Sequence, residues 1–183
     1  AKWISELSNH FRYIKIQATS GNHGRFHKKP RFKKRNVLNF DYLLYEFIRR
    51  EVQEIVDEFI LPKSFFLFHQ TLGFNFLITH GDLFKGGTGL NPISGTICRD
   101  IEKINGVCKH TGRQFQYVEI GHFHTSILDI PSFSGISVIQ NGSIKGTDEF
   151  SLGAVKSGER PIQNIYVVEE DYGVKFRTPI YLD

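Results

Sequence analysis

The stretch FNFLITHGD at residues 74–82 is a short apolar run that ends in a histidine, a glycine and an aspartate. Aromatic and branched side chains pack well on a pleated sheet, so this run predicts a β-strand over residues 74–79. The glycine that follows the histidine indicates a loop. The sequence therefore places His80 at the point where a strand passes into a loop.

The same arrangement occurs twice more along the chain. A predicted strand at residues 13–19 runs into Gly21-Asn22-His23, and another at 115–120 runs into Gly121-His122-Phe123-His124. Functional groups gather on loops beyond the carboxyl ends of strands, because a rigid sheet fixes those loops relative to one another. We therefore expect these histidines and Asn22 to converge in space.

Helical spacing of apolar residues predicts a helix at residues 2–11 and a second helix that Asn39 begins and Pro62 ends. We expect the apolar stripe of the second helix to face a core. Its members are Phe40, Leu43, Leu44, Phe47, Ile48, Ile55 and Phe59. A glycine-rich loop at 86–95 leads to a third helix near 97–109. The other predicted strands are 65–70, which forms a hairpin with 74–79, then 136–140, 165–169 and 174–181, so the fold class is α/β.

Length and composition predict one globular domain. The 183 residues are 40% hydrophobic and 14% aromatic, too rich in aromatic side chains for a disordered chain. Cys98 and Cys108 lie in a predicted helix without Cys-x-x-Cys spacing, which favours small buried groups over a disulfide framework or a thiolate metal site. Because no disulfide framework is indicated, we expect a location in the reducing cytoplasm. No apolar run reaches the length of a membrane span, so we expect no membrane partner. Oligomeric state is not indicated.

The residue types at the three strand ends favour metal chemistry. Neutral imidazole is a common metal ligand, and a His-x-His pair on a loop can direct two rings at neighbouring ions. Asn22 adds an amide oxygen. A mixed set of imidazole and oxygen ligands favours a catalytic site with harder ions, such as manganese or iron, over a structural zinc site. The alternatives to metal binding are structural. Asn22 and Asp82 could shape turns, His80 could be a buried imidazole, and His122 and His124 could be surface residues.

Taken in order, the three motifs resemble those of the calcineurin-like metallophosphoesterase superfamily, which includes phage and bacterial phosphoesterases and DNA-repair nucleases. Gly21-Asn22-His23 resembles its Gly-Asn-His-(Asp/Glu) motif, the segment around His80 its single-histidine strand end, and Gly121–His124 its Gly-His-x-His motif. Asn141-Gly142-Ser143 resembles a further segment, Asn-Pro-Gly-Ser, without the proline. The resemblance implies a layered αββα sandwich, with residues 1–183 as the C-terminal portion of a single domain.

The resemblance also implies roles for individual residues. Asn22, His80 and His122 would bind one divalent metal ion, His124 would bind a second, and His23 would be the general acid. Manganese is the first expectation for the two ions, with iron or zinc as alternatives. The implied reaction is hydrolysis of phosphate esters, and the implied setting is the cytoplasm of a bacterium or a phage-infected cell.

Two departures from the family pattern stand in the sequence. The Asp-x-His and Gly-Asp-x-x-Asp motifs expected ahead of Gly21 do not occur, so the resemblance implies a sandwich incomplete at the N-terminus whose bridging aspartate comes from upstream residues. Gly24 and Arg25 follow Asn22-His23, where the family has an acidic residue. The metal-ligand set within residues 1–183 is therefore incomplete.

A basic segment at residues 25–36 follows the candidate acid directly. Arg25, Lys28, Lys29 and Arg31 would bind substrate phosphates, and the interleaved Phe26 and Phe32 would stack on bases, although a solvated loop explains the charges equally well. The preferred interpretation is a phosphodiesterase or nuclease acting on nucleic acid. The alternatives are a phosphomonoesterase or Ser/Thr protein phosphatase on the same centre, and a noncatalytic nucleic-acid-binding or scaffolding domain with a degenerate site.

Overall fold

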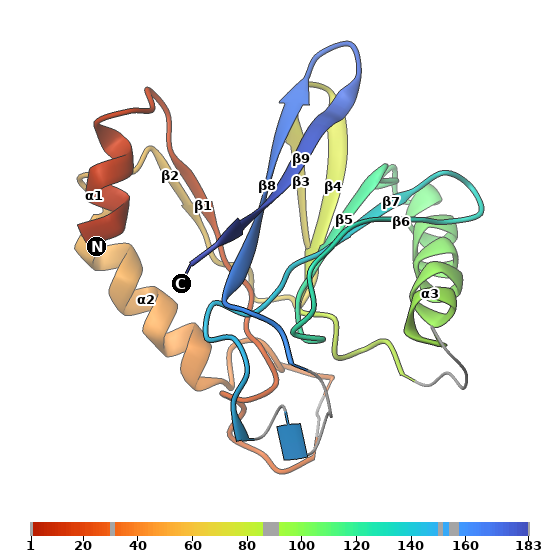
Figure 1. Cartoon of the computed structure of the whole chain (residues 1–183), viewed down its shortest axis with the longest axis horizontal. Coiled ribbons are helices and arrows are strands. Elements are labelled where there is room, and N and C mark those ends of the chain that lie inside the picture. The colour runs from red at the N-terminus through yellow and green to blue at the C-terminus, as the bar shows by residue number, and fades with distance from the viewer. Residues whose placement is uncertain (1, 30–31, 86–91, 150–151, 154–157, 183) are drawn as a thin grey trace. The chain divides into compact units, whose positions relative to one another are not determined.

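A computed structural model of the chain describes residues 2–29, 32–85, 92–149, 152–153 and 158–182 (Figure 1). Helices and strands alternate in it, which confirms the predicted α/β class. The contacts divide the chain into two compact units, one up to Leu67 and one from Phe68 onward. The single domain expected over residues 1–183 stays a prediction, and each unit is described in turn.

The first unit pairs two short strands in parallel. Its elements in chain order are α1 (Lys2–Ser8), β1 (Lys15–Gln17), α2 (Phe40–Val52) and β2 (Glu58–Ile60). In this pairing Lys15 lies opposite Glu58, and the two side chains form an ion pair at 2.9 Å. The Asp57 carboxylate accepts a hydrogen bond from the Ile14 backbone at 2.7 Å, which ties the start of β1 to the segment before β2.

The second predicted helix is shorter than its apolar repeat suggested. It ends at Val52, and residues 58–60 form a strand that the sequence analysis missed. The expectation that the apolar stripe faces a core was wrong, since the side chains of Phe40 and Phe47 are 64% and 54% exposed. The helix ends early because residues 58–60 pair with β1: the Ala18 N–H donates to Ile60 O at 3.0 Å, a contact that local periodicity cannot reveal.

The second unit is built on a five-stranded sheet in the order β3-β4-β5-β7-β6. Its elements are β3 (Leu67–Thr71), β4 (Phe74–Thr79), α3 (Pro92–Lys109), β5 (Tyr117–Ile120), β6 (Ile127–Pro131), β7 (Ser137–Gln140), β8 (Ile162–Glu169) and β9 (Gly173–Tyr181). β4, β5 and β7 run parallel, and β6 pairs antiparallel with β7. The predicted β3–β4 hairpin is confirmed: its turn residues Leu72 and Gly73 have φ of +47° and +85°, as a two-residue hairpin turn requires.

Helix α3 and the β8–β9 hairpin cover opposite faces of this sheet (Figure 1). The helix buries Ile97, Ile101 and Cys98, as expected for the cysteine, while Cys108 is only half-buried. On the other face the Tyr166 hydroxyl of β8 donates to Glu119 of β5. Burial of the phenol, together with the Glu119 charge, raises the pKa of Tyr166 and keeps it a hydrogen-bond donor.

Within the described residues, the helices are too short or too polar to cross a lipid bilayer.

We expect the stability of the second unit to depend strongly on Phe76. Its side chain is 1% exposed, and its ring stacks on those of His69 and Tyr117, with centroid distances of 4.8 Å in both cases. The Phe76→Ala substitution should lower the free energy of unfolding by about 3–5 kcal/mol in a urea titration, because it leaves a cavity. Phe133→Ala is the matched control, since Phe133 is 90% exposed and should change stability by less than about 0.5 kcal/mol. Equal effects of the two substitutions would contradict the assigned core.

Candidate metal site

Parallel pairing of β4 with β5 brings two of the predicted ligands together. Thr79 lies opposite Ile120 at the ends of these strands, and the Gly121 N–H donates to His80 O at 3.0 Å, which extends the ladder by one step. The chain then turns away on both sides, and the His80 and His122 rings meet edge to face with centroids 5.1 Å apart. The predicted convergence of these two histidines is therefore found within the second unit.

The backbone at the His-x-His segment is strained. His122 has a φ of +70°, and the N–H of Phe123 donates to Gly121 O at 2.8 Å, so His122 is the central residue of a γ-turn. His124 also has a positive φ, of +61°. Non-glycine residues held in this region cost free energy and cluster at functional sites, where surrounding structure fixes a side chain in one direction.

A glycine on the facing loop allows the two histidine loops to approach each other. Gly81 has a φ of +108°, and a Cβ atom there would lie 3.0 Å from Gly121 O and 3.4 Å from the Cβ of His122. Any larger residue would therefore press directly on the segment that carries His122. Gly81 is therefore required for the contact between the His80 and His122 rings, in addition to marking the start of a loop.

His124 carries an atom whose environment suits a metal ligand. Within the described part of the chain, its Nδ1 is buried and has no hydrogen-bond partner. A buried polar nitrogen without a partner costs free energy, and binding to a metal ion would offset that cost. The described residues nevertheless hold no group of three or more His, Cys, Asp or Glu side chains arranged to bind one ion. The structure thus brings His80 and His122 together but does not add His124 to them as a third member.

In the first unit, the start of α2 holds the loop that carries Asn22 and His23. Asn39 caps the helix, as predicted, by accepting from the Asp41 N–H at 2.8 Å, and its side-chain amide donates to Gly21 O at 2.7 Å. The Asp41 carboxylate accepts from the Gly21 N–H at 2.9 Å. One helix terminus therefore binds both backbone polar groups of Gly21. His23 is exposed beside this anchor, and Asn22 is half-buried.

Close packing at this anchor explains the residue after Asn22-His23. A Cβ atom at Gly24 would collide with Asn39 Oδ1 and with the Asp41 carboxylate, so no side chain fits there. The Asp41 carboxylate thus occupies the space that a side chain at position 24 would need. Sequence reasoning missed Asp41, although an acidic residue two positions after an N-cap asparagine could have drawn attention to it.

The roles of the predicted site residues stay predictions, and the structure shows where the described ones lie within each unit. That Asn22 and His23 join the histidines of the second unit in one site stays a prediction. Asp82 lies in a turn closed by the Phe84 N–H and Gly81 O at 3.1 Å, as the turn interpretation expected. Arg31 lies outside the described residues, as do residues 86–91 of the glycine-rich loop. The phosphate-binding roles of Arg25, Lys28 and Lys29 stay predictions.

Comparison with solved structures identifies the fold. Neither a protein-family model nor a curated protein matches the sequence. The chain is similar to a single-residue mutant of Vps29 from Entamoeba histolytica, with 10% identity over 100% of this chain and 90% of that one and a TM-score of 0.51. It is also similar to an archaeal phosphodiesterase (18% identity, 98% and 74% covered, TM-score 0.48) and to zinc-complexed wild-type Vps29 from the same Entamoeba species (11%, 71% and 72%, TM-score 0.45). The match to the Vps29 mutant shows that this chain shares the fold of that protein, a mixed α/β arrangement of helices around a central sheet.

We expect Gly81→Ala to disturb the histidine pair. The methyl group would force either the strained φ or the contact with His122 to change, at a cost of about 1–3 kcal/mol. Denaturant unfolding should show this loss of stability, and the imidazole NMR signals of His80 and His122 should shift.

Gly106→Ala is the matched control for this substitution. Gly106 lies in α3, has no positive φ and has open space around its Cβ position, so the same added methyl group should leave stability unchanged or slightly improved. If Gly81→Ala behaved like Gly106→Ala, the close approach of the two loops would be refuted.

Proposed function

We propose that the chain acts as a metal-dependent phosphodiesterase with nucleic acid as its substrate class. The observation that carries this proposal is the meeting of His80 and His122 beyond two adjacent parallel strands, with ring centroids 5.1 Å apart. Ligands and reactive groups collect at this edge of α/β sheets. The fold supports the same reaction class, and the three motifs resemble those of metallophosphoesterases.

The proposed metal ligands are Asn22, His80 and His122 for one divalent ion and His124 for a second. The buried and unpartnered Nδ1 of His124, and the paired rings of His80 and His122, fit this role within the described residues. Manganese is the first choice, with iron or zinc as alternatives. When bound, two such ions would neutralise charge on the phosphate and lower the pKa of a water molecule.

His23 is the proposed general acid. Its ring is exposed, so a substrate can reach it, while the hydrogen bonds of Asn39 and Asp41 to Gly21 hold the backbone two residues before it. Histidine is the side chain best suited to give up a proton near neutral pH. In this role His23 would protonate the leaving oxygen of the phosphate ester.

Two other functions remain in competition. A phosphomonoesterase or protein phosphatase would use the same residues on a smaller phosphate group. A noncatalytic nucleic-acid-binding or scaffolding domain is favoured by a specific observation, since no three metal-binding side chains come together among the residues that the structure describes.

Manganese binding tests the ligand assignment without relying on activity. Isothermal titration calorimetry should detect manganese binding to the unaltered chain. His122→Ala should weaken the affinity by about 100-fold or more, because loss of a residue that only hydrogen-bonds to a metal ligand already lowers metal affinity by about 10- to 100-fold. His110→Ala is the control, because His110 is exposed just after α3 and should not affect binding. Equal affinities of the two variants would remove His122 from the ligand set.

Hydrolysis of model substrates tests the reaction. With manganese present, the chain should cleave bis-p-nitrophenyl phosphate faster than p-nitrophenyl phosphate, and His23→Ala should lower kcat by about 10²- to 10⁴-fold while leaving manganese affinity unchanged. His10→Ala, at another exposed histidine of the same unit, should match the unaltered chain. Preference for the monoester would favour a phosphatase. Metal binding without hydrolysis of either substrate would favour the noncatalytic function.

A further inference from the structure

Positive charge is concentrated in one part of the first unit. Residues 7–40 contain nine lysine and arginine residues and no aspartate or glutamate. The whole chain has a net charge of only +4, so the remainder of the sequence is net negative. Most of these positive charges lie in the basic loop, residues 25–36, of which the structure describes 25–29 and 32–36.

The lysines of the basic loop are available to a partner. Lys28, Lys29, Lys33 and Lys34 are exposed, and in the described part of the chain none of them pairs with a carboxylate. Lys15, outside the loop, contrasts with them because it pairs with Glu58 at 2.9 Å. Uncompensated ammonium groups at this density favour a polyanion, because phosphate contacts release the counterions of a nucleic acid.

Like charges are also crowded at the end of the loop. Burial and the nearby Arg25 guanidinium lower the pKa of Arg35, so the two arginines repel one another. The Arg35 guanidinium lies over the Phe65 ring at 5.8 Å from its centroid, which partly offsets this repulsion.

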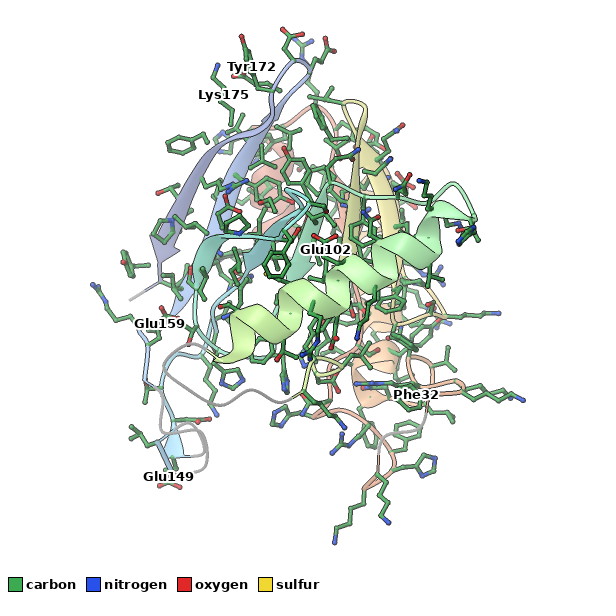
Figure 2. All side chains as sticks on the ribbon, turned by 90° about the vertical axis from the view of Figure 1, so that its right-hand side faces the viewer. Phe32, Glu102, Glu149, Glu159, Tyr172 and Lys175 are labelled. Carbon is green, nitrogen blue, oxygen red and sulfur yellow. The ribbon has the colours of Figure 1, made fainter. Side chains whose placement is uncertain are left out.

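Two aromatic side chains are exposed among these charges. Phe32 is 71% exposed and is labelled at the surface in Figure 2, and Phe26 is 48% exposed. The Phe26 ring rests edge-on against Phe40 with centroids 4.6 Å apart, whereas Phe32 extends into solvent. Exposed rings beside phosphate-binding cations form a stacking platform for unpaired bases. A duplex cannot use such a platform, because its bases are already paired and stacked.

Hydrogen bonds at its two ends give the basic loop a defined base. The Phe26 N–H donates to Leu38 O at 3.3 Å, and the Phe40 N–H donates to Gly24 O at 2.6 Å. Asn36, which is 1% exposed, donates to Pro62 O at 2.5 Å and accepts from the Ser20 N–H at 3.0 Å. A loop closed in this way loses less conformational entropy on binding than a free segment does. Its base adjoins the segment that carries His23.

We propose that the basic loop is a binding surface for single-stranded nucleic acid, in which Lys28, Lys29, Lys33 and Lys34 contact phosphates and Phe32 stacks on a base. This inference rests on the substrate class proposed above and adds the strandedness of the substrate and the residues that select it. Binding at the loop requires no metal ion. DNA and RNA single strands share the chemistry that the loop recognises.

Fluorescence anisotropy in EDTA measures this binding separately from hydrolysis. The unaltered chain should bind labelled dT20 or rU20 more tightly than a 20-base-pair duplex, and the tighter of the two single strands identifies the natural polymer. Phe32→Ala should weaken single-strand binding by about tenfold, the loss of one stacked base, and leave duplex binding unchanged. Phe133→Ala, which removes a ring that is 90% exposed in the second unit, should have no effect.

A charge substitution tests the phosphate contacts. Lys28→Ala with Lys29→Ala should reduce the slope of log affinity against log salt by about 1.4 for single strands, that is about 0.7 for each phosphate contact. Lys103→Ala with Lys109→Ala removes the same charge from exposed positions on α3 and should leave the slope unchanged. The proposal would be overturned if both double variants lost affinity equally. It would also be overturned if the chain bound duplex as tightly as single strands and Phe32→Ala had no effect. Absence of hydrolysis would not, because no metal is present.

Discussion

The candidate site depends on the register of one pair of parallel strands. β4 and β5 are neighbours in the centre of the sheet, and Thr79 lies opposite Ile120, so the chain leaves both strands at the same level and on the same edge. β7 extends this edge, since the Asn141 N–H donates to Ile120 O at 2.7 Å. A slip of one residue would turn every side chain of β5 to the other face and would remove His122 from His80. Val118 is fully buried, which opposes such a slip because it would turn this side chain to the other face.

A comparable constraint operates in the first unit, where a helix cap takes the place of a strand register. Asn39 caps α2 and also donates to Gly21 O, so the same side chain that begins the helix holds the loop that carries Asn22 and His23. The lack of space at Gly24 follows from the same packing. In each unit a backbone element positions the candidate functional residues: a helix cap in the first unit and a pair of parallel strands in the second.

Much of this arrangement could be predicted from sequence because its signals are local. The β3–β4 hairpin, the cap at Asn39 and the strand ends at His80 and His122 all follow from residue types within a few positions. The end of α2, strand β2 and strand β6 could not be predicted, because they depend on partners distant in the sequence. β6 contains Asp129 and Pro131, which read as a loop; an edge strand tolerates the proline, and Arg177 of β9 pairs with the aspartate at 2.5 Å.

The central claim is that His80 and His122 bind a divalent metal ion together. Anomalous scattering from crystals of the chain soaked in manganese, recorded at the manganese absorption edge, tests this claim most directly. We expect a peak at coordination distance, about 2 Å, from an imidazole nitrogen of each of the two rings. Full-occupancy manganese elsewhere in the molecule, with His80 and His122 contacting only protein atoms, would contradict it.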